Sequence, residues 1–177
     1  MGQLSARLVT PFRWERGRLV GDVEPYEAAL LRQVVADVRD VLSGDASDGE
    51  SGGSAGAPDP VAERLLPIGH RSDTDMASDY RSLTEAGLRR EKLADAALLL
   101  DTVSESGGRV EIDENGAEAW IRTINDVRLA IGVRLDVRES DDPMVRAEQS
   151  GDPRWAAYSW LTAVQGLLVD ALSTKHR

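Results

Sequence analysis

Apolar residues recur every three or four positions through most of the chain, and this spacing predicts a series of helices. A proline at position 25 suits the first turn of a helix, and Gly44 is a natural stop, so the first helix is expected between them. Its apolar stripe is predicted to contain Tyr26, Leu30, Val34, Val38, Val41 and Leu42, widened by Leu31 and Val35.

Two further helical segments follow in the middle of the chain. Asp59-Pro60 combines a capping residue with a first-turn proline and predicts a short helix. A longer helical region runs from about 73 to 103. Thr84 can cap a new helix and Gly87 is a weak point, so we expect two helices there, with a bend near residue 84.

The clearest helical pattern covers residues 114–136, after a minimal extended piece at 110–112. The acidic stretch 139–151 is predicted to be a loop, and Asp152-Pro153 begins the last helix. The last helix carries more apolar residues than one stripe can hold, so both of its sides are expected to pack against other parts of the protein or a second chain. The apolar face of the 114–136 helix is expected to consist of Trp120, Ile124, Val127, Ile131 and Leu135.

A short extended pattern precedes the helices. Phe12 and Trp14 alternate with charged residues, Gly17 permits a turn, and Leu19-Val20 returns the chain, which predicts a β-hairpin. A lone hairpin is marginally stable in water, so Phe12 or Trp14 is expected to dock on the helices. The predicted fold is mainly α: a single-domain helical bundle with a short N-terminal β-hairpin.

The length of 177 residues fits one domain, 1–177. Within it, residues 44–58 are acidic, rich in Gly and Ser, and contain no large apolar side chain, so we expect a flexible loop. Asp45–Gly49 resembles the start of a calcium loop, and Gly52–Gly56 matches a serine-nucleophile pattern. The linker composition around both favours a disordered segment over either site.

Composition excludes several kinds of chemistry. The chain has no cysteine, which rules out disulfides, zinc fingers and thiol catalysis, and it has two histidines, His70 and His176. The candidate paired carboxylates flank a proline in a polar stretch, where a solvated charge run is favoured over catalysis. These are Asp136, Glu139, Asp141, Asp142 and Glu148. We expect no enzymatic activity, cofactor or metal.

The charge balance bears on partners and location. Lys and Arg number 21 against 31 Asp and Glu, a net charge of −10. The most basic helical patch, Arg89, Arg90 and Lys92, is short and interrupted by Glu91, so nucleic-acid binding is disfavoured. Because the sequence shows neither a signal peptide nor an apolar run near the ~18 residues of a membrane helix, a cytoplasmic protein without a membrane partner is expected.

Three residues of the 114–136 helix, Asn125, Arg128 and Gly132, fall on one side of it, beside the apolar face. A glycine inside a helix costs up to ~1 kcal/mol relative to alanine, which suggests the close approach of another element. Two interpretations remain open. The favoured one is a buried polar network that fixes helix packing, and the other is a binding surface.

The same run carries a family resemblance. Residues 124–129, Ile-Asn-Asp-Val-Arg-Leu, and 132–135, Gly-Val-Arg-Leu, resemble the pattern of an actinobacterial family of unknown function that is typically encoded beside the ClpS protease adaptor. Residues 80–84, 88–92 and 160–162 are also similar, and the resemblance spans nearly the whole chain apart from the 44–58 insert. The family-motif residues are Trp120, Asn125, Asp126, Arg128, Gly132 and Arg134.

The resemblance implies a regulatory role. Some members are described as transcriptional regulators linked to oxidative stress, with a cysteine-based switch and a sigma-factor contact. This chain lacks cysteine, so that switch does not transfer. We expect a non-enzymatic regulator that acts by protein–protein contact, with a sigma factor or a protease-adaptor system as partner. The alternative is a DNA-binding transcriptional regulator.

Self-association is a further expectation. The surplus apolar surface predicts a homodimer that uses part of the last helix or the 73–103 region. The nearly equal alternative is that Phe12 and Trp14 cover the last helix within one chain.

Overall fold

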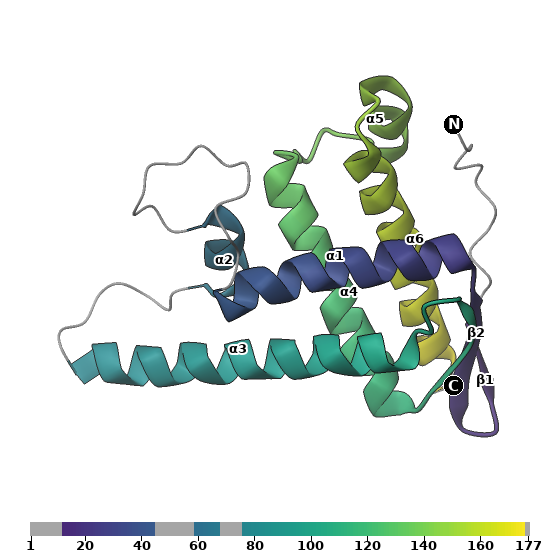
Figure 1. Cartoon of the computed structure of the whole chain (residues 1–177), viewed down its shortest axis with the longest axis horizontal. Coiled ribbons are helices and arrows are strands. Elements are labelled where there is room, and N and C mark those ends of the chain that lie inside the picture. Colours follow the sequence, from purple (N-terminus) through teal and green to yellow (C-terminus); the bar gives the residue numbers. More distant parts are fainter. Residues whose placement is uncertain (1–11, 45–58, 68–75, 176–177) are drawn as a thin grey trace.

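The computed structural model describes residues 12–44, 59–67 and 76–175, and within the last range the side chains of residues 84–174. This part of the chain forms six helices and a small antiparallel sheet (Figure 1). The predicted mainly helical fold with an N-terminal hairpin is thereby confirmed. The expected flexible loop falls, beyond Gly44, outside the described residues. No helix within the described ranges is long and apolar enough to cross a membrane.

The elements follow one another in a simple order. The strands are β1 Arg13–Glu15, β2 Arg18–Val23 and β3 Gly108–Ile112. The helices are α1 Pro25–Ser43, α2 Pro60–Leu65, α3 Met76–Thr102, α4 Glu114–Arg134, α5 Pro143–Ser150 and α6 Pro153–Lys175.

The hairpin closes through a two-residue turn. Arg16 and Gly17 both have positive φ angles, 51° and 80°, as a tight turn between twisted antiparallel strands requires. The extended piece at 110–112 becomes part of β3, which pairs with the far side of β2. The sequence did not indicate this pairing, because residues 24–107 lie between the two strands and only the tertiary fold brings them together.

Phe12 and Trp14 attach the sheet to the helices. Phe12 lies across Gly21, where an added Cβ would stand 2.6 Å from the ring, so that position requires glycine. The Phe12 ring meets Trp120 of α4 edge to face, with centroids 6.0 Å apart. Trp14 donates its Nε1–H to the Ala171 carbonyl of α6, at 2.8 Å. The expected docking is therefore confirmed, and it uses both aromatic side chains.

Helices α1 and α3 run antiparallel, and each supplies an arginine to the C-terminal end of the other. Arg32 of α1 donates to the carbonyls of Leu100 and Val103, at 2.9 and 2.8 Å. Arg89 of α3 donates to the carbonyl of Leu42. These bonds satisfy carbonyl oxygens that have no partner inside their own helix, and they place positive charge at the negative ends of both helix dipoles.

Three helix starts share one device. Asp59, Asp142 and Asp152 each precede a proline, and each accepts a backbone N–H from the first turn of the following helix at 2.8–2.9 Å. The prediction of a loop over 139–151 is therefore wrong for Pro143–Ser150, which forms α5. The acidic composition concealed a start signal that the sequence uses at two other places.

Two other helix predictions need correction. The region from Met76 to Thr102 is one continuous helix, without the expected division near Thr84, because an internal glycine such as Gly87 costs only about 1 kcal/mol relative to alanine and does not by itself end a helix. Tyr26 is 51% exposed and lies outside the core. The buried face of α1 is instead centred on Leu31, Val35, Val38, Val41 and Leu42.

Candidate functional site

The family motif lies on α4, which begins at a well-formed cap. The Asp113 carboxylate accepts the backbone N–H of Gly116 at 2.8 Å. The predicted apolar face is confirmed as buried up to Ile131, whereas Leu135 is only partly buried. The helix stops at Arg134, two residues earlier than expected, because Asp136 adopts a left-handed φ of 49°.

Trp120 is the centre of the motif helix. Its side chain is fully buried, and its Nε1–H donates to the Thr102 hydroxyl of α3 at 2.9 Å while Phe12 packs on its ring. The residue therefore connects α4 with α3 and with the start of the hairpin. Its place in the motif follows from packing, since no part of it reaches the surface.

One flank of α4 faces α3 through two ion pairs. Lys92 donates to Asp126 at 2.6 Å, and the Asp126 side chain is 8% exposed. Burial raises the pKa of the Asp126 carboxyl above its ordinary value, although the hydrogen bond from Lys92 acts in the opposite direction. Arg122 spans both carboxylate oxygens of Asp95 at 2.7 and 3.0 Å.

Between these two pairs the surface opens into a groove. Its volume is about 490 Å³, and one wall comes from α3 and the other from α4. We call it the α3/α4 groove, and define it by its lining residues, Leu88, Glu91, Lys92, Ala94, Asp95, Arg122, Asn125 and Asp126. Asn125, a motif residue, contributes an amide, which both donates and accepts hydrogen bonds.

The other flank of α4 faces α6 and is closed. The Arg128 guanidinium lies 5.2 Å above the Tyr158 ring and donates to the Thr162 hydroxyl, at 3.0 Å, and to the Gln165 side chain. Gly132 is close to the same ring, since an added Cβ would stand 3.6 Å from it. That distance is an ordinary contact, so the available space does not require glycine here.

The motif therefore divides into two sets, which the linear spacing did not reveal. Arg128 and Gly132 contact α6, whereas Asn125 and Asp126 line the α3/α4 groove. Arg134 is exposed in the last turn of α4, where its charge suits the helix C-terminus. Of the two motif residues that line the groove, Asp126 is buried and paired with Lys92, whereas Asn125 is partly exposed.

Three acidic residues after α4 make contacts that support the local fold. Asp142 caps α5, Asp136 pairs with Arg138, and Asp141 accepts from the Arg138 backbone and lies near Arg146. Within the described ranges, no three His, Cys, Asp or Glu side chains are arranged to hold a metal ion. His70, His176 and the two linker motifs at 45–49 and 52–56 lie outside the described residues.

The sequence analysis missed one buried carboxylate, Glu27, which is 4% exposed at the start of α1. It accepts the backbone N–H of Glu24 at 2.9 Å and the indole N–H of Trp160 at 3.1 Å. The first contact has a recognisable signal, an acidic residue three positions after the cap. The second, which ties α6 to the start of α1, has none in the sequence.

Comparison with known proteins finds relatives that are named as regulators. It is 34% identical over 188 residues to proteins named oxidative stress regulator AosR in Mycobacterium tuberculosis and Mycobacterium bovis, covering 89% of this chain and 86% of theirs. A Mycobacterium leprae protein named putative oxidative stress regulator AosR is 35% identical, covering 85% and 80%. No solved structure matches the chain.

A family model described as a domain of unknown function, DUF2017, matches residues 9–172, which include every element of the fold apart from the last three residues of α6. The match agrees with the resemblance carried by the 120–135 run. The chain belongs to the DUF2017 family.

Proposed function

We propose that this protein is a non-enzymatic regulator that acts by binding another protein. The observation that carries the proposal is its 34% identity, over 89% of the chain, to proteins named oxidative stress regulators. The residue inventory agrees with it, because the chain has no cysteine nucleophile and two histidines, and the described carboxylates with visible contacts cap helices or pair with cations.

The contact surface in this proposal is the α3/α4 groove. It combines apolar wall from Leu88 and Ala94 with charges of both signs and the amide of Asn125. A mixed lining of this kind suits a polypeptide segment, whose backbone and side chains present both donors and acceptors. The occupant is a segment of a protein partner, and the partner classes are a sigma factor and a protease adaptor of the ClpS type.

The trigger differs from a thiol switch, because the chain contains no cysteine. Regulation in this protein then depends on the concentration of the partner or on competition for the groove. The motif residues that pair α4 with α3 and α6 hold the groove open in one shape, which lowers the entropic cost of binding.

The arrangement of the basic patch favours protein binding over the DNA-binding alternative. Arg89 is held by the Leu42 carbonyl and Glu85, and Lys92 is held by Asp126. Two of the three cations of this patch are therefore engaged within the chain. Arg90 is left, and one cation gives little phosphate neutralisation at physiological salt.

The test is affinity capture from native cytoplasm, with sigma factors and ClpS scored by name. Asn125→Lys places a long cationic side chain in the groove and should abolish capture. Asn115→Lys is the matched control, since Asn115 is exposed on the first turn of the same helix and does not line the groove. Capture of no specific protein by the wild type, or equal capture by both variants, would contradict the proposal.

A further inference from the structure

Helix α2 is attached to the rest of the described fold through apolar contacts alone. Val61 and Leu65 are each 2% exposed, Leu66 is 5% exposed, and all three belong to the hydrophobic core. The helix packs mainly on α4 and also touches α1 (Figure 1). Among the described residues, every hydrogen bond that α2 makes stays between Asp59 and Leu66, and its side chains form no ion pair.

Other packed elements have polar contacts across their interfaces. Trp14 ties the hairpin to α6, Trp160 ties α6 to Glu27 of α1, and Arg32 ties α1 to the end of α3. Breaking such a contact leaves a buried polar group without its partner, which is costly. Because no polar bond joins α2 to the other described elements, its release strands no polar group in them.

The segment is also short and loosely tied along the chain. A helix of six residues is unstable alone in water, so α2 is helical because it is docked. Three buried aliphatic side chains offset the entropic cost of ordering it, and a balance of this size is typical of the least stable parts of a fold. Residues 44–59 and 66–75 join α2 to α1 and α3, and even the shorter connection can span about 30 Å when extended. Helix α2 can therefore leave its surface without moving either neighbour.

We propose that α2 is a removable cover over a second binding surface, formed by α4 and α1, which takes a short amphipathic helix of another protein. The docked α2 shows what fits there, since its buried aliphatic residues Val61, Leu65 and Leu66 stand at positions i, i+4 and i+5. A partner helix with this spacing makes the same contacts when it displaces α2. The surface is separate from the α3/α4 groove, which is lined by residues of α3 and α4.

The docked helix acts as a built-in competitor of the partner. The apparent affinity of the surface is its intrinsic affinity multiplied by the fraction of molecules in which α2 is released. Docking is the state that the structure shows, so this fraction is small in the wild type. A change that prevents docking therefore raises the affinity for a helix supplied in trans.

Fluorescence anisotropy with the chain's own segment tests this surface. The probe is a labelled peptide of residues 57–67, and the open variant carries Val61→Asp with Leu65→Asp, so that its own α2 cannot dock. The open variant should bind the peptide at least ~10-fold more tightly than the wild type. Glu63→Asp with Arg64→Asp is the matched control, since it places two aspartates at exposed positions of α2 and should bind as weakly as the wild type.

Two further measurements complete the test. A peptide that itself carries Val61→Asp and Leu65→Asp should not bind the open variant. In the unmodified protein, the amides of residues 61–66 should exchange hydrogen at least ~10-fold faster than the buried amides of α4, which shows that α2 is released while α4 stays folded.

Three outcomes would overturn the proposal. They are equal protection of α2 and α4, an open variant that no longer unfolds cooperatively, and an open variant that binds no peptide at about 1 mM, the order of concentration at which a tethered segment acts. The second outcome would make α2 an essential part of the core. Neither the α3/α4 groove nor partner capture enters these measurements, so they leave the proposed function to its own test.

Discussion

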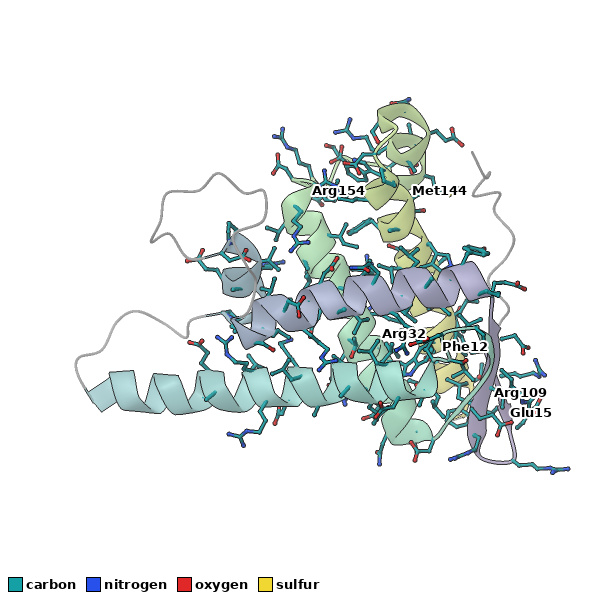
Figure 2. The ribbon with its side chains drawn as sticks, viewed as in Figure 1. Phe12, Glu15, Arg32, Arg109, Met144 and Arg154 are labelled. Atoms are coloured by element: carbon teal, nitrogen blue, oxygen red, sulfur yellow. The ribbon has the colours of Figure 1, made fainter. Side chains whose placement is uncertain are left out.

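The two flanks of α4 are built from similar residue types and end in different surfaces. Toward α3, two ion pairs cross the interface, Lys92–Asp126 and Arg122–Asp95, and the α3/α4 groove opens between them. Toward α6, Arg128 is covered by the Tyr158 ring and bonds two neutral side chains. Figure 2 shows side chains in the spaces between the helix ribbons.

The difference shows that residues of one motif can have different structural effects. An ion pair across two helices requires a set distance between its charged groups, so two such pairs hold the helices at a fixed separation and leave the space between the pairs open. An arginine over an aromatic ring fills its own space and seals the contact. The α3 flank is therefore suited to binding, and the α6 flank to packing.

The largest expected effect comes from Trp120, the fully buried centre of α4. Trp120→Ala should lower the free energy of unfolding by about 3–5 kcal/mol, since it removes a fully buried aromatic side chain together with its hydrogen bond to the Thr102 hydroxyl. Chemical denaturation measures the loss. A decrease below ~1 kcal/mol would mean that α4 is anchored elsewhere.

The second prediction tests the stability that the ion pair on the α3 flank contributes. Lys92→Met leaves the Asp126 carboxylate buried without its cation and should cost about 2–3 kcal/mol. The double variant Lys92→Met with Asp126→Leu removes both charges and should be more stable than Lys92→Met alone. A double-mutant cycle by urea denaturation checks this, and additive losses would show that the pair is not coupled.

The corresponding substitution on the α6 flank should cost less stability. Arg128→Met keeps an apolar contact with the Tyr158 ring and leaves behind neutral groups that water can reach, so we expect a loss of about 1 kcal/mol. The same denaturation assay serves. A loss as large as that of Lys92→Met would remove the distinction between the two flanks.

Gly132 gives an effect of opposite sign. Gly132→Ala adds a methyl group at ordinary contact distance from Tyr158 and removes the cost of glycine in a helix. We expect a gain of up to about 1 kcal/mol, seen as a higher melting temperature. Gly21→Ala is the contrasting control, because its methyl group would collide with the Phe12 ring and should destabilise the protein.

The finest test is pH dependence. Burial raises the pKa of Asp126 above the ordinary value of 3.8, so the folded state holds this proton more tightly than the unfolded state. The stability of the wild type relative to Asp126→Asn should therefore fall as pH rises from 3.8 through the raised pKa. Unfolding free energies of both proteins across this range give the difference, and a flat or rising difference would contradict the assignment.

Much of the fold was predictable because its signals are local. Capping residues, first-turn prolines and apolar spacing located five of the six helices found in the described ranges, and alternation with Gly17 located the hairpin. The missed helix, α5, has the same Asp-Pro start as α2 and α6, and was concealed by acidic composition. The error lay in weighting composition above a capping signal.

The candidate site was only half predictable. Helical spacing placed Asn125, Arg128 and Gly132 on one side of α4, which is correct for the isolated helix. Which neighbour each residue meets depends on the angles at which α3 and α6 cross α4, and spacing along one helix carries no information about them. The groove beside Asn125 and the hydrogen bond from the Trp160 indole to Glu27 also depend on how the helices pack, so spacing along one helix could not predict them.

The sequence by itself determined five of the six described helices and most of their starts, the hairpin and the family, because each rests on residues within a few positions of one another or on a contiguous motif. The tertiary structure decided which polar groups are buried together. Lys92 meets Asp126, Arg32 reaches the end of α3, and β3 joins β2, all across long stretches of chain. Such pairings depend on how the apolar faces pack, since burial brings the polar groups together and leaves them no partner but one another.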